Sequence, residues 1–388
     1  MQRRTILRCV AALFALAATG EPVRAEETIR IGLILPMSGP FASTGKQIAT
    51  GASLYMQQNG DTVAGKKIDL IVKDDTGVAD TTKRIAQELI VNDKVTAIAG
   101  FGLTPLALAS APVATQGKTP MVIMSAATAI ITERSPFIVR TAQVVPQISA
   151  PFGAWVAREG MKRVITLVTD YGPGHDVEKW FSDAFKAAGG QVENMRVPLQ
   201  NPDFAPFLQR IADTKPDALL VFVPSGVGAQ FMKQFAERGL DKSGIRLIGT
   251  GDVTDDDILN AMGDVALGVV TAHHYSAAHD SPENKAFVEA FKKANGGLRP
   301  NFMAVQGYDG MHVLYEGLKK TAGAGGEALV DAMKGLAWTS PRGPVSIDPE
   351  TRDIIQNVYI RKVERVGGEL YNVEFATIPS VKDPSKMK

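Results

Sequence analysis

Small loops rich in serine, threonine and glycine follow several predicted strands in the first half of this 388-residue chain. They occupy residues 36–45, 100–105 and 125–128. Such loops can direct backbone N–H groups and hydroxyls at an anion, assisted by the N-terminus of a following helix. Taken singly, each loop is more simply explained as a helix cap. Several such loops at one edge of a sheet favour a binding site for a small carboxylate.

Three further loops follow predicted strands in the second half of the chain, at residues 169–174, 224–226 and 249–252. Ligands of parallel α/β sheets bind beyond the carboxyl ends of the strands. These loops, which contain Tyr171, Pro224 and Asp252, are therefore the other candidates for ligand contact.

Signatures of common enzyme classes are absent from the sequence. It has no Gly-X-Ser-X-Gly nucleophile elbow, no Gly-X4-Gly-Lys-Ser/Thr phosphate loop and no His-Glu-X-X-His zinc motif. The segment Gly172-Pro173-Gly174 lacks the third glycine of a dinucleotide-binding fingerprint. We therefore expect a binding protein with no catalytic residues and no cofactor.

A histidine-rich segment, with His273, His274, His279 and Asp280, raises the question of a metal site. Adjacent side chains on a strand point to opposite faces, so the neighbouring pair could not easily share one ion. We expect no metal site here. A polar contact from His273 or Tyr275 to the ligand or to a hinge is the favoured explanation.

Other acidic residues have simpler explanations. Residues 255–257, three consecutive aspartates, are expected in the first turn of a helix, where the helix dipole favours negative charge. Asp74, Asp75 and Asp203 are expected to be solvated turn residues.

Apolar strands alternate with amphipathic helices over most of the chain. The strands are expected at residues 29–35, 68–72, 95–99, 121–124, 137–140, 164–168, 191–197, 218–223, 245–248 and 269–273. The helices are expected at residues 48–57, 81–91, 107–115, 146–158, 177–187, 204–212, 228–237 and 255–262. Buried strands between such helices indicate parallel sheets covered on both faces, and a change of register after residue 140 indicates two of them.

The last third of the chain is too short to bury a core alone. Its expected elements are helices at 283–294 and 304–319 and short strands at 345–347, 358–363 and 370–373. We therefore assign residues 26–142 and 279–343 to an N-terminal lobe, and residues 143–278 and 344–388 to a C-terminal lobe. The fold class predicted is α/β, with two doubly wound parallel-sheet lobes. Three chain crossings would form a hinge that lets the lobes close.

Residues 1–25 have the pattern of a secretory signal peptide. Arg3, Arg4 and Arg8 precede an apolar run at 10–18 that is too short to span a bilayer, and Val23-Arg24-Ala25 suits cleavage after Ala25. The arginine pair leaves both the general secretory and the twin-arginine route open. We expect the mature chain in the periplasm.

Charge and cysteine usage exclude several partner classes. Removal of residues 1–25, with four arginines and one glutamate, changes the net charge from +1 to −2, which gives no electrostatic footprint for nucleic acid or an anionic membrane. The only cysteine, Cys9, is removed with this segment, so we expect no disulfide in the mature chain. No second apolar stretch is long enough to insert into a membrane. We expect a monomer.

Three motifs in order carry a family resemblance: Leu35-Pro36-Met37-Ser38-Gly39-Pro40 with Gly45, then Ser125-Ala126-Ala127-Thr128, then Asp170-Tyr171-Gly172. They are similar to those of the branched-chain-amino-acid type of periplasmic solute-binding protein, the receptors of ABC importers. The resemblance runs over nearly all of residues 26–388. It implies the type I periplasmic binding fold, a ligand held between two lobes, and ABC permease subunits as partners.

The resemblance also implies roles for particular residues. Thr104 would bind the ligand carboxylate through its hydroxyl, Ala126 to Thr128 would supply backbone groups and a hydroxyl, and Tyr171 would reach in from the second lobe. Thr44 stands where these receptors often have an aromatic wall. The ligand-binding set predicted in this way, with His273 and Tyr275 from the argument above, is Thr44, Phe101, Thr104, Ser125, Ala126, Ala127, Thr128, Tyr171, Pro224, Asp252, His273 and Tyr275.

Two positions depart from the amino-acid-binding pattern. Pro224 replaces a second tyrosine, and Gly251 stands near the usual acidic partner of the α-amine, with Asp252 one place later. A buried ammonium without its partner would be costly, so a carboxylate without an amine fits better.

The segments 249–257 and 273–283 resemble the subgroup that takes up aromatic carboxylates of the benzoate and hydroxycinnamate types. Phe101 and Tyr171 could sandwich a ring, although Phe101 could equally belong to the core. The alternatives are a receptor for branched-chain or other aliphatic amino acids or amides, a secreted α/β enzyme, and a sensor domain.

Overall fold

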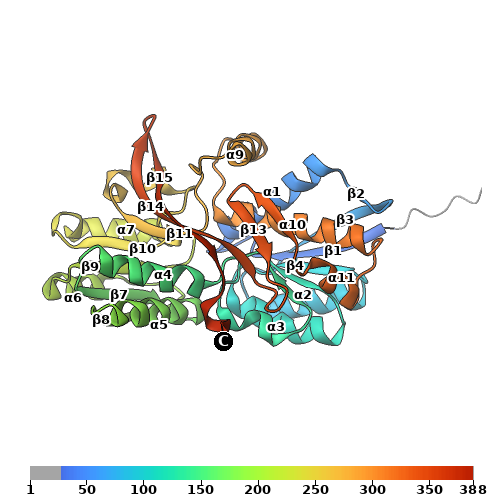
Figure 1. The fold of residues 1–388 in the computed structure, drawn as a ribbon, viewed down its shortest axis with the longest axis horizontal. Helices are drawn as coiled ribbons and strands as arrows, with labels where there is room; N and C mark the ends of the chain where they lie inside the picture. The colour runs from blue at the N-terminus through green and yellow to red at the C-terminus, as the bar shows by residue number, and fades with distance from the viewer. Residues whose placement is uncertain (1–27, 388) are drawn as a thin grey trace, which may run out of the picture.

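The structure, a computed structural model, describes residues 28–387, which form two lobes at opposite ends of the long axis (Figure 1). The predicted signal peptide at residues 1–25 lies outside the described residues. Within the described part of the chain, no helix is long and apolar enough to cross a membrane.

The N-terminal lobe is built on a six-stranded sheet with the order β2-β3-β1-β4-β5-β6. All of its strand pairs are parallel except β2 with β3. Its strands are β1 (Thr28–Leu35), β2 (Thr62–Val63), β3 (Lys66–Asp74), β4 (Ala97–Gly100), β5 (Met121–Ile123) and β6 (Ile138–Arg140). Its helices are α1 (Ala42–Asn59), α2 (Ala79–Val91), α3 (Thr104–Gln116), η1 (Ala129–Arg134), α9 (Pro282–Ala294), α10 (Phe302–Lys320) and α11 (Gly326–Met333).

Helices cover both faces of this sheet, because its central strands are apolar on both sides. Ile31 and Leu33 of β1 pack in one cluster with α1 and α10, whereas Ile34 packs in another with α2 and α3. Helices α1 and α10 approach closely at two glycines. A Cβ at Gly51 or at Gly307 would collide with the backbone of the facing helix.

The C-terminal lobe is built on a nine-stranded sheet with the order β12-β13-β14-β11-β10-β9-β7-β8, with β15 paired to β14. Strands β7 to β11 are parallel, and β12 to β15 pair antiparallel. Its strands are β7 (Arg163–Thr169), β8 (Gln191–Val197), β9 (Ala218–Phe222), β10 (Arg246–Thr250), β11 (Val270–His273), β12 (Ala337–Ser340), β13 (Gly343–Ile347), β14 (Ile354–Val366) and β15 (Glu369–Val381). The helices of this part are α4 (Val145–Arg158), α5 (Gly172–Ala187), α6 (Ala205–Thr214), α7 (Gly228–Glu237), η2 (Leu240–Lys242), η3 (Gly251–Thr254), α8 (Leu259–Met262), η4 (Gly263–Ala266) and η5 (Pro384–Lys386).

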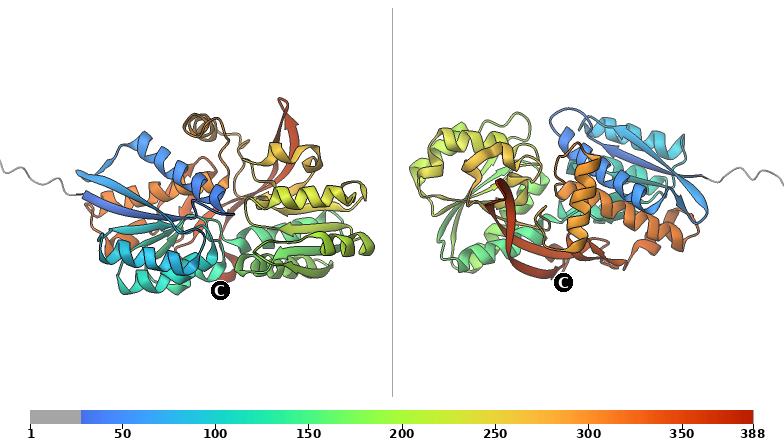
Figure 2. Two further views of the ribbon diagram at one scale, coloured as in Figure 1. Left: turned by 180° about the vertical axis from the view of Figure 1, so that it is seen from behind. Right: turned by 90° about the horizontal axis from the view of Figure 1, so that it is seen from above.

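The long strand β14 joins the two lobes. Ile354 packs in the core of the N-terminal lobe, whereas Ile360 and Val363 pack in the two clusters of the C-terminal lobe. Figure 2 shows β14 and β15 running along one side of the molecule past the boundary between the lobes. The two doubly wound, parallel-dominated sheets confirm the predicted fold class.

The exact lobe boundaries stay a prediction. Strands β12 and β13 belong to the sheet of the C-terminal lobe, yet Trp338, Val345 and Ile347 pack against the core of the N-terminal lobe. The last segment therefore serves both lobes, and the sequence offered no sign of this because pairing partners far apart in the chain decide it.

Three local expectations are wrong. The helix expected at 255–262 is only the short α8, preceded by the 3-10 turn η3, and Asp255 and Asp256 are 2% and 4% exposed instead of lying on a solvated helix turn. Asp75 is fully buried because its carboxylate accepts hydrogen bonds from the Gly77 N–H (2.9 Å) and the Thr82 hydroxyl (3.1 Å). Asp74 and Asp203 are exposed, as expected.

The strands expected at 358–363 and 370–373 are each extended to 13 residues in β14 and β15. Much of their length is not apolar, so the sequence pattern indicated only the middle of β14 and the beginning of β15.

Candidate functional site

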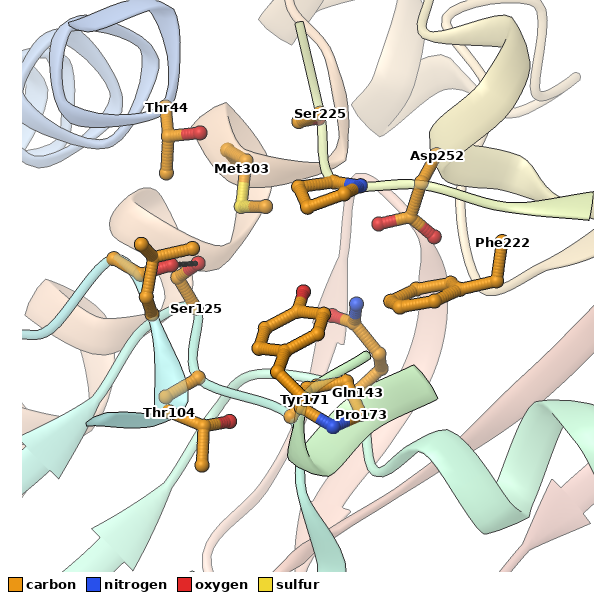
Figure 3. Close-up of a pocket in the computed structure, with 15 residues that line it drawn as sticks. Thr44, Thr104, Ser125, Gln143, Tyr171, Pro173, Phe222, Ser225, Asp252 and Met303 are labelled. Atoms are coloured by element: carbon orange, nitrogen blue, oxygen red, sulfur yellow. Dashed lines mark hydrogen bonds between the residues drawn. The ribbon is translucent and has the colours of Figure 1, made fainter. Parts of the chain in front are cut away.

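A cavity lies between the lobes, at the carboxyl ends of strands from both sheets (Figure 3). The empty space between its lining atoms is about 380 Å³, part of which is open to solvent. It is lined by Thr44, Gly102, Leu103, Thr104, Ser125, Ala126, Ala127, Gln143, Tyr171, Pro173, Phe222, Pro224, Ser225, Asp252 and Met303.

The N-terminal lobe contributes hydroxyls and a helix N-terminus. Thr104 is the first residue of α3, so its N–H has no partner within the helix, whereas Pro105 has no N–H and the Leu106 and Ala107 N–H groups donate to the Leu103 carbonyl. The Thr104 hydroxyl bonds the Thr128 hydroxyl (2.8 Å), and the Ser125 hydroxyl donates to the Gly102 carbonyl (2.8 Å). An anion placed against this end would be stabilised by the N-terminal dipole.

The loop before α3 is shaped by a glycine. Gly100 has a φ of +107°, and a Cβ there would collide with the Ile34 carbonyl. This turn sends the Phe101 side chain into the core cluster with Ile34, where it is fully buried. The next residue, Gly102, lines the cavity, so Phe101 anchors this loop to the core and does not contact the cavity.

The C-terminal lobe contributes an aromatic pair. The rings of Tyr171 and Phe222 stack with centroids 6.0 Å apart and an interplanar angle of 17°. Burial, and secondly the charge of Asp252, raises the pKa of the Tyr171 phenol well above its usual value of 10. The phenol is therefore neutral at physiological pH and can donate one hydrogen bond.

Among residues 28–387, Asp252 is the one carboxylate that lines the cavity, and it is 6% exposed. His273 lies beside it, with its Nε2 3.7 Å from Asp252 Oδ2. This separation is longer than a hydrogen bond. Burial lowers the pKa of His273 from 6.5 to about 4, so the imidazole is neutral at pH 7.

A buried charge network lies behind Asp252. Arg361 is fully buried, and its Nη1 is 4.0 Å from Asp256 Oδ2. Burial, followed by the neighbouring aspartates, raises the pKa of Asp255 well above its usual value. The Ser225 hydroxyl is hydrogen-bonded to Asp255. Ser225 is thus held by the network.

Hydrogen bonds between the lobes hold the cavity in an enclosed form. Asp257 of the C-terminal lobe accepts from the Ser43 hydroxyl (2.7 Å) and from Asn301 Nδ2 (3.2 Å) of the N-terminal lobe. The backbone N–H of Ala129 donates to Asp176 of α5 (2.9 Å). These contacts must break before a ligand can reach a cavity that both lobes line.

This arrangement of two lobes around a central cavity matches a known family over most of the chain. The periplasmic binding protein family matches at residues 28–369. The chain belongs to the periplasmic binding protein family.

Solved structures and a curated relative resemble this periplasmic binding protein closely. A solute binding protein of an ABC transporter from Rhodopseudomonas palustris BisB5, in complex with 3,4-dihydroxy benzoic acid, is 63% identical with a TM-score of 0.91, covering 93% of this chain and 99% of that one. One from Rhodopseudomonas palustris HaA2, in complex with p-hydroxybenzoic acid, is 41% identical with a TM-score of 0.89, with the same coverage. A Leu/Ile/Val-binding protein homolog 6 from Brucella melitensis biotype 1 is 44% identical over 380 residues, 96% of each chain.

Most of the predicted ligand-binding residues meet at the cavity of this periplasmic binding protein. They are Thr44, Thr104, Ser125, Ala126, Ala127, Tyr171, Pro224 and Asp252. Thr128 is not among the lining residues, but its hydroxyl is hydrogen-bonded to the Thr104 hydroxyl. Phe101, His273 and Tyr275 are fully buried and lie outside the lining.

Several lining residues escaped the sequence analysis. Phe222 lies two residues before Pro224 at the end of β9, and its position could have indicated it; Ser225 lies in the candidate loop 224–226 but was not in the predicted ligand-binding set. Gln143 and Met303 come from a hinge segment and from α10, and no local pattern marked them.

The strand pattern predicted that the side chains of His273 and His274 point to opposite faces. This prediction is wrong. Strand β11 ends at His273, so the alternation stops there, and the ring centroids of His273 and His274 lie 4.4 Å apart. Both rings pack against Phe302. Within residues 28–387, no group of three or more His, Cys, Asp or Glu side chains is arranged to hold a metal ion.

Proposed function

We propose that this protein is the solute-binding receptor of an ABC importer and that it captures a small aromatic carboxylate of the benzoate or hydroxycinnamate type. The observation that carries the proposal is the cavity between the lobes, with hydroxyls and a helix N-terminus on one side and a stacked aromatic pair on the other. The lobes would close on the ligand and present the closed form to permease subunits.

The N-terminal lobe provides the hydrogen-bond donors that would bind the ligand carboxylate. The hydroxyl and the backbone N–H of Thr104, at the start of α3, provide donors at one end of the cavity. Closure excludes water, which strengthens each of these hydrogen bonds.

The remaining walls suit an aromatic ring. Tyr171, Phe222 and Met303 present ring faces and apolar edges to the cavity (Figure 3), and Pro224 also lines it. Relatives that are 63% and 41% identical hold dihydroxy- and hydroxybenzoic acids, which have this combination of a carboxylate and a ring.

A second candidate is an aliphatic amino acid. The Brucella relative is named as a Leu/Ile/Val-binding homologue, and the Asp252 carboxylate could pair with an ammonium group. In this reading Asp252 would replace the usual acidic partner of the amine.

Calorimetric titration with benzoates, hydroxycinnamates and branched-chain amino acids separates the two candidates. We expect tight binding of one or more aromatic acids and none of leucine, isoleucine or valine. Thr104→Ala and Tyr171→Ala should each weaken the binding by about 1 kcal/mol or more, because each removes a hydrogen-bonding group from the cavity. The exposed Thr62→Ala is the control and should bind as the wild type does.

Tight binding of leucine together with failure of all aromatic acids would overturn the proposal. Mass spectrometry of the recovered ligand tests the enzyme alternative, because a receptor returns the compound unchanged. Cleavage after Ala25, export to the periplasm and a monomeric state stay predictions.

A further inference from the structure

We propose that Asp252 makes this site selective for hydroxylated aromatic acids, by accepting hydrogen bonds from ring hydroxyls remote from the ligand carboxylate. The inference rests on the proposed aromatic-acid function and deepens it. It assigns a specificity-determining role to a residue that the general fold does not require.

Asp252 lies on the side of the cavity opposite to the expected carboxylate site (Figure 3). Asp252 enters the cavity from the C-terminal lobe after β10, whereas Thr104 and Ser125 enter from the N-terminal lobe. In Figure 3 Asp252 and Thr104 lie on opposite sides of the Tyr171 ring. A ligand that satisfies both ends needs an anion at one end and a hydrogen-bond donor at the other.

An α-amino acid fits this separation poorly. Its ammonium and carboxylate share one carbon, so the two groups cannot reach opposite ends of the cavity. A benzoate with a hydroxyl at position 3 or 4 places a rigid ring between the carboxylate and the donor.

The Asp252 carboxylate is also left without a hydrogen-bond donor in the described part of the chain. The side chain is nine-tenths buried, and its contact with His273 at 3.7 Å is longer than a hydrogen bond. Both ring nitrogens of His273 also lack a hydrogen-bond partner in the described chain. Leaving a buried carboxylate without donors costs free energy, which ligand hydroxyls would recover.

The chemistry of a carboxylate sets the direction of selection. An ionised carboxylate only accepts hydrogen bonds, and its two oxygens can serve two neighbouring hydroxyls. It therefore favours hydroxyl groups, gains nothing from a methoxy group, and repels a second carboxylate. Ser225, another hydroxyl that lines the cavity, is already hydrogen-bonded to Asp255.

The test is calorimetric titration of the wild type, Asp252→Asn and Asp252→Ala with benzoate, 4-hydroxybenzoate, 3,4-dihydroxybenzoate, 4-methoxybenzoate and terephthalate. We expect the wild type to prefer the hydroxylated acids over benzoate and 4-methoxybenzoate, and to reject terephthalate. Each variant should bind the hydroxylated acids about tenfold or more weakly, because a charge-assisted hydrogen bond is lost. Binding of benzoate should change by less than about threefold, on the same scale, and terephthalate should bind better to Asp252→Asn.

The exposed Asp241→Asn serves as the matched control and should leave every affinity unchanged. The ratio of affinities between hydroxylated acids and benzoate separates selectivity from general damage to the fold. Equal loss for benzoate and the hydroxylated acids, or an unchanged preference in both variants, would overturn the role of Asp252 alone. A wild type that binds no aromatic acid would overturn the proposed function, and this inference with it.

Discussion

At the scale of single residues, the site depends on a glycine beside its carboxylate. A Cβ at Gly251 would collide with His273 and Arg361, so only glycine lets both side chains pack behind Asp252. The packing also buries His273 completely, and the lowered pKa keeps its imidazole uncharged at neutral pH. A neutral imidazole leaves the negative charge of Asp252 available to a ligand.

This burial predicts a pH dependence of stability. The pKa of His273 falls from 6.5 to about 4 on folding, chiefly through desolvation, so the unfolded chain binds a proton that the folded chain does not. Stability therefore falls as the pH drops from 6.5 to 4. Between pH 6.5 and pH 4, the burial of neutral His273 lowers the free energy of unfolding by about 3 kcal/mol. His273→Gln should remove that part of the pH dependence. Urea unfolding of both proteins at pH 7 and pH 4.5 measures it.

His175→Gln is the matched control, because it removes a histidine whose side chain is 45% exposed instead of a buried one. His274 is also buried and stays in both proteins, so its own desolvation acts in both. Parallel pH profiles for wild type and His273→Gln would show that His273 does not carry the effect.

At the scale of elements, the sequence predicted what depends on local pattern. The alternation of Ile31 and Leu33 with Ile34 indicated a strand buried on both faces, and the sheet has it. The length of β14 and the shortness of α8 were missed, because pairing with β11, β13 and β15 and burial of Asp255 and Asp256 decide them. Long-range contacts of this kind leave no periodic signal.

Elements of the two lobes meet at Asp257, which predicts an effect on ligand release. Asp257→Ala removes the hydrogen bonds to Ser43 and Asn301 that hold the lobes together, although Asp257 does not line the cavity. The closed form should lose about 1 kcal/mol, which is about a fivefold loss of affinity. Stopped-flow measurement with an aromatic acid should show the change mainly in the dissociation rate.

Asp241→Asn again provides the control for a surface aspartate. An unchanged dissociation rate in Asp257→Ala would mean that these hydrogen bonds do not stabilise the closed lobes.

At the scale of the whole molecule, the topology brings the site together from distant segments. The loops after strands could be predicted, because parallel strands end at one edge of each sheet. Gln143 and Met303 could not, since they reach the cavity only once the chain has crossed between the lobes. The same crossings carry buried polar groups, such as the hydrogen bond of Gln143 with Gln306.

Arg342 joins these crossings, and its loss should destabilise the whole protein. The fully buried guanidinium bonds the Thr141 carbonyl (2.8 Å), Gln356 Oε1 (2.9 Å) and the Asp309 carboxylate (2.8 Å). Arg342→Ala leaves Asp309 charged and buried without its cation, so unfolding by urea should show a loss of about 3–5 kcal/mol. The double variant Arg342→Met with Asp309→Leu should recover part of it, because no isolated charge remains. Matching losses in the single and the double variant would instead assign the effect to packing at the hinge.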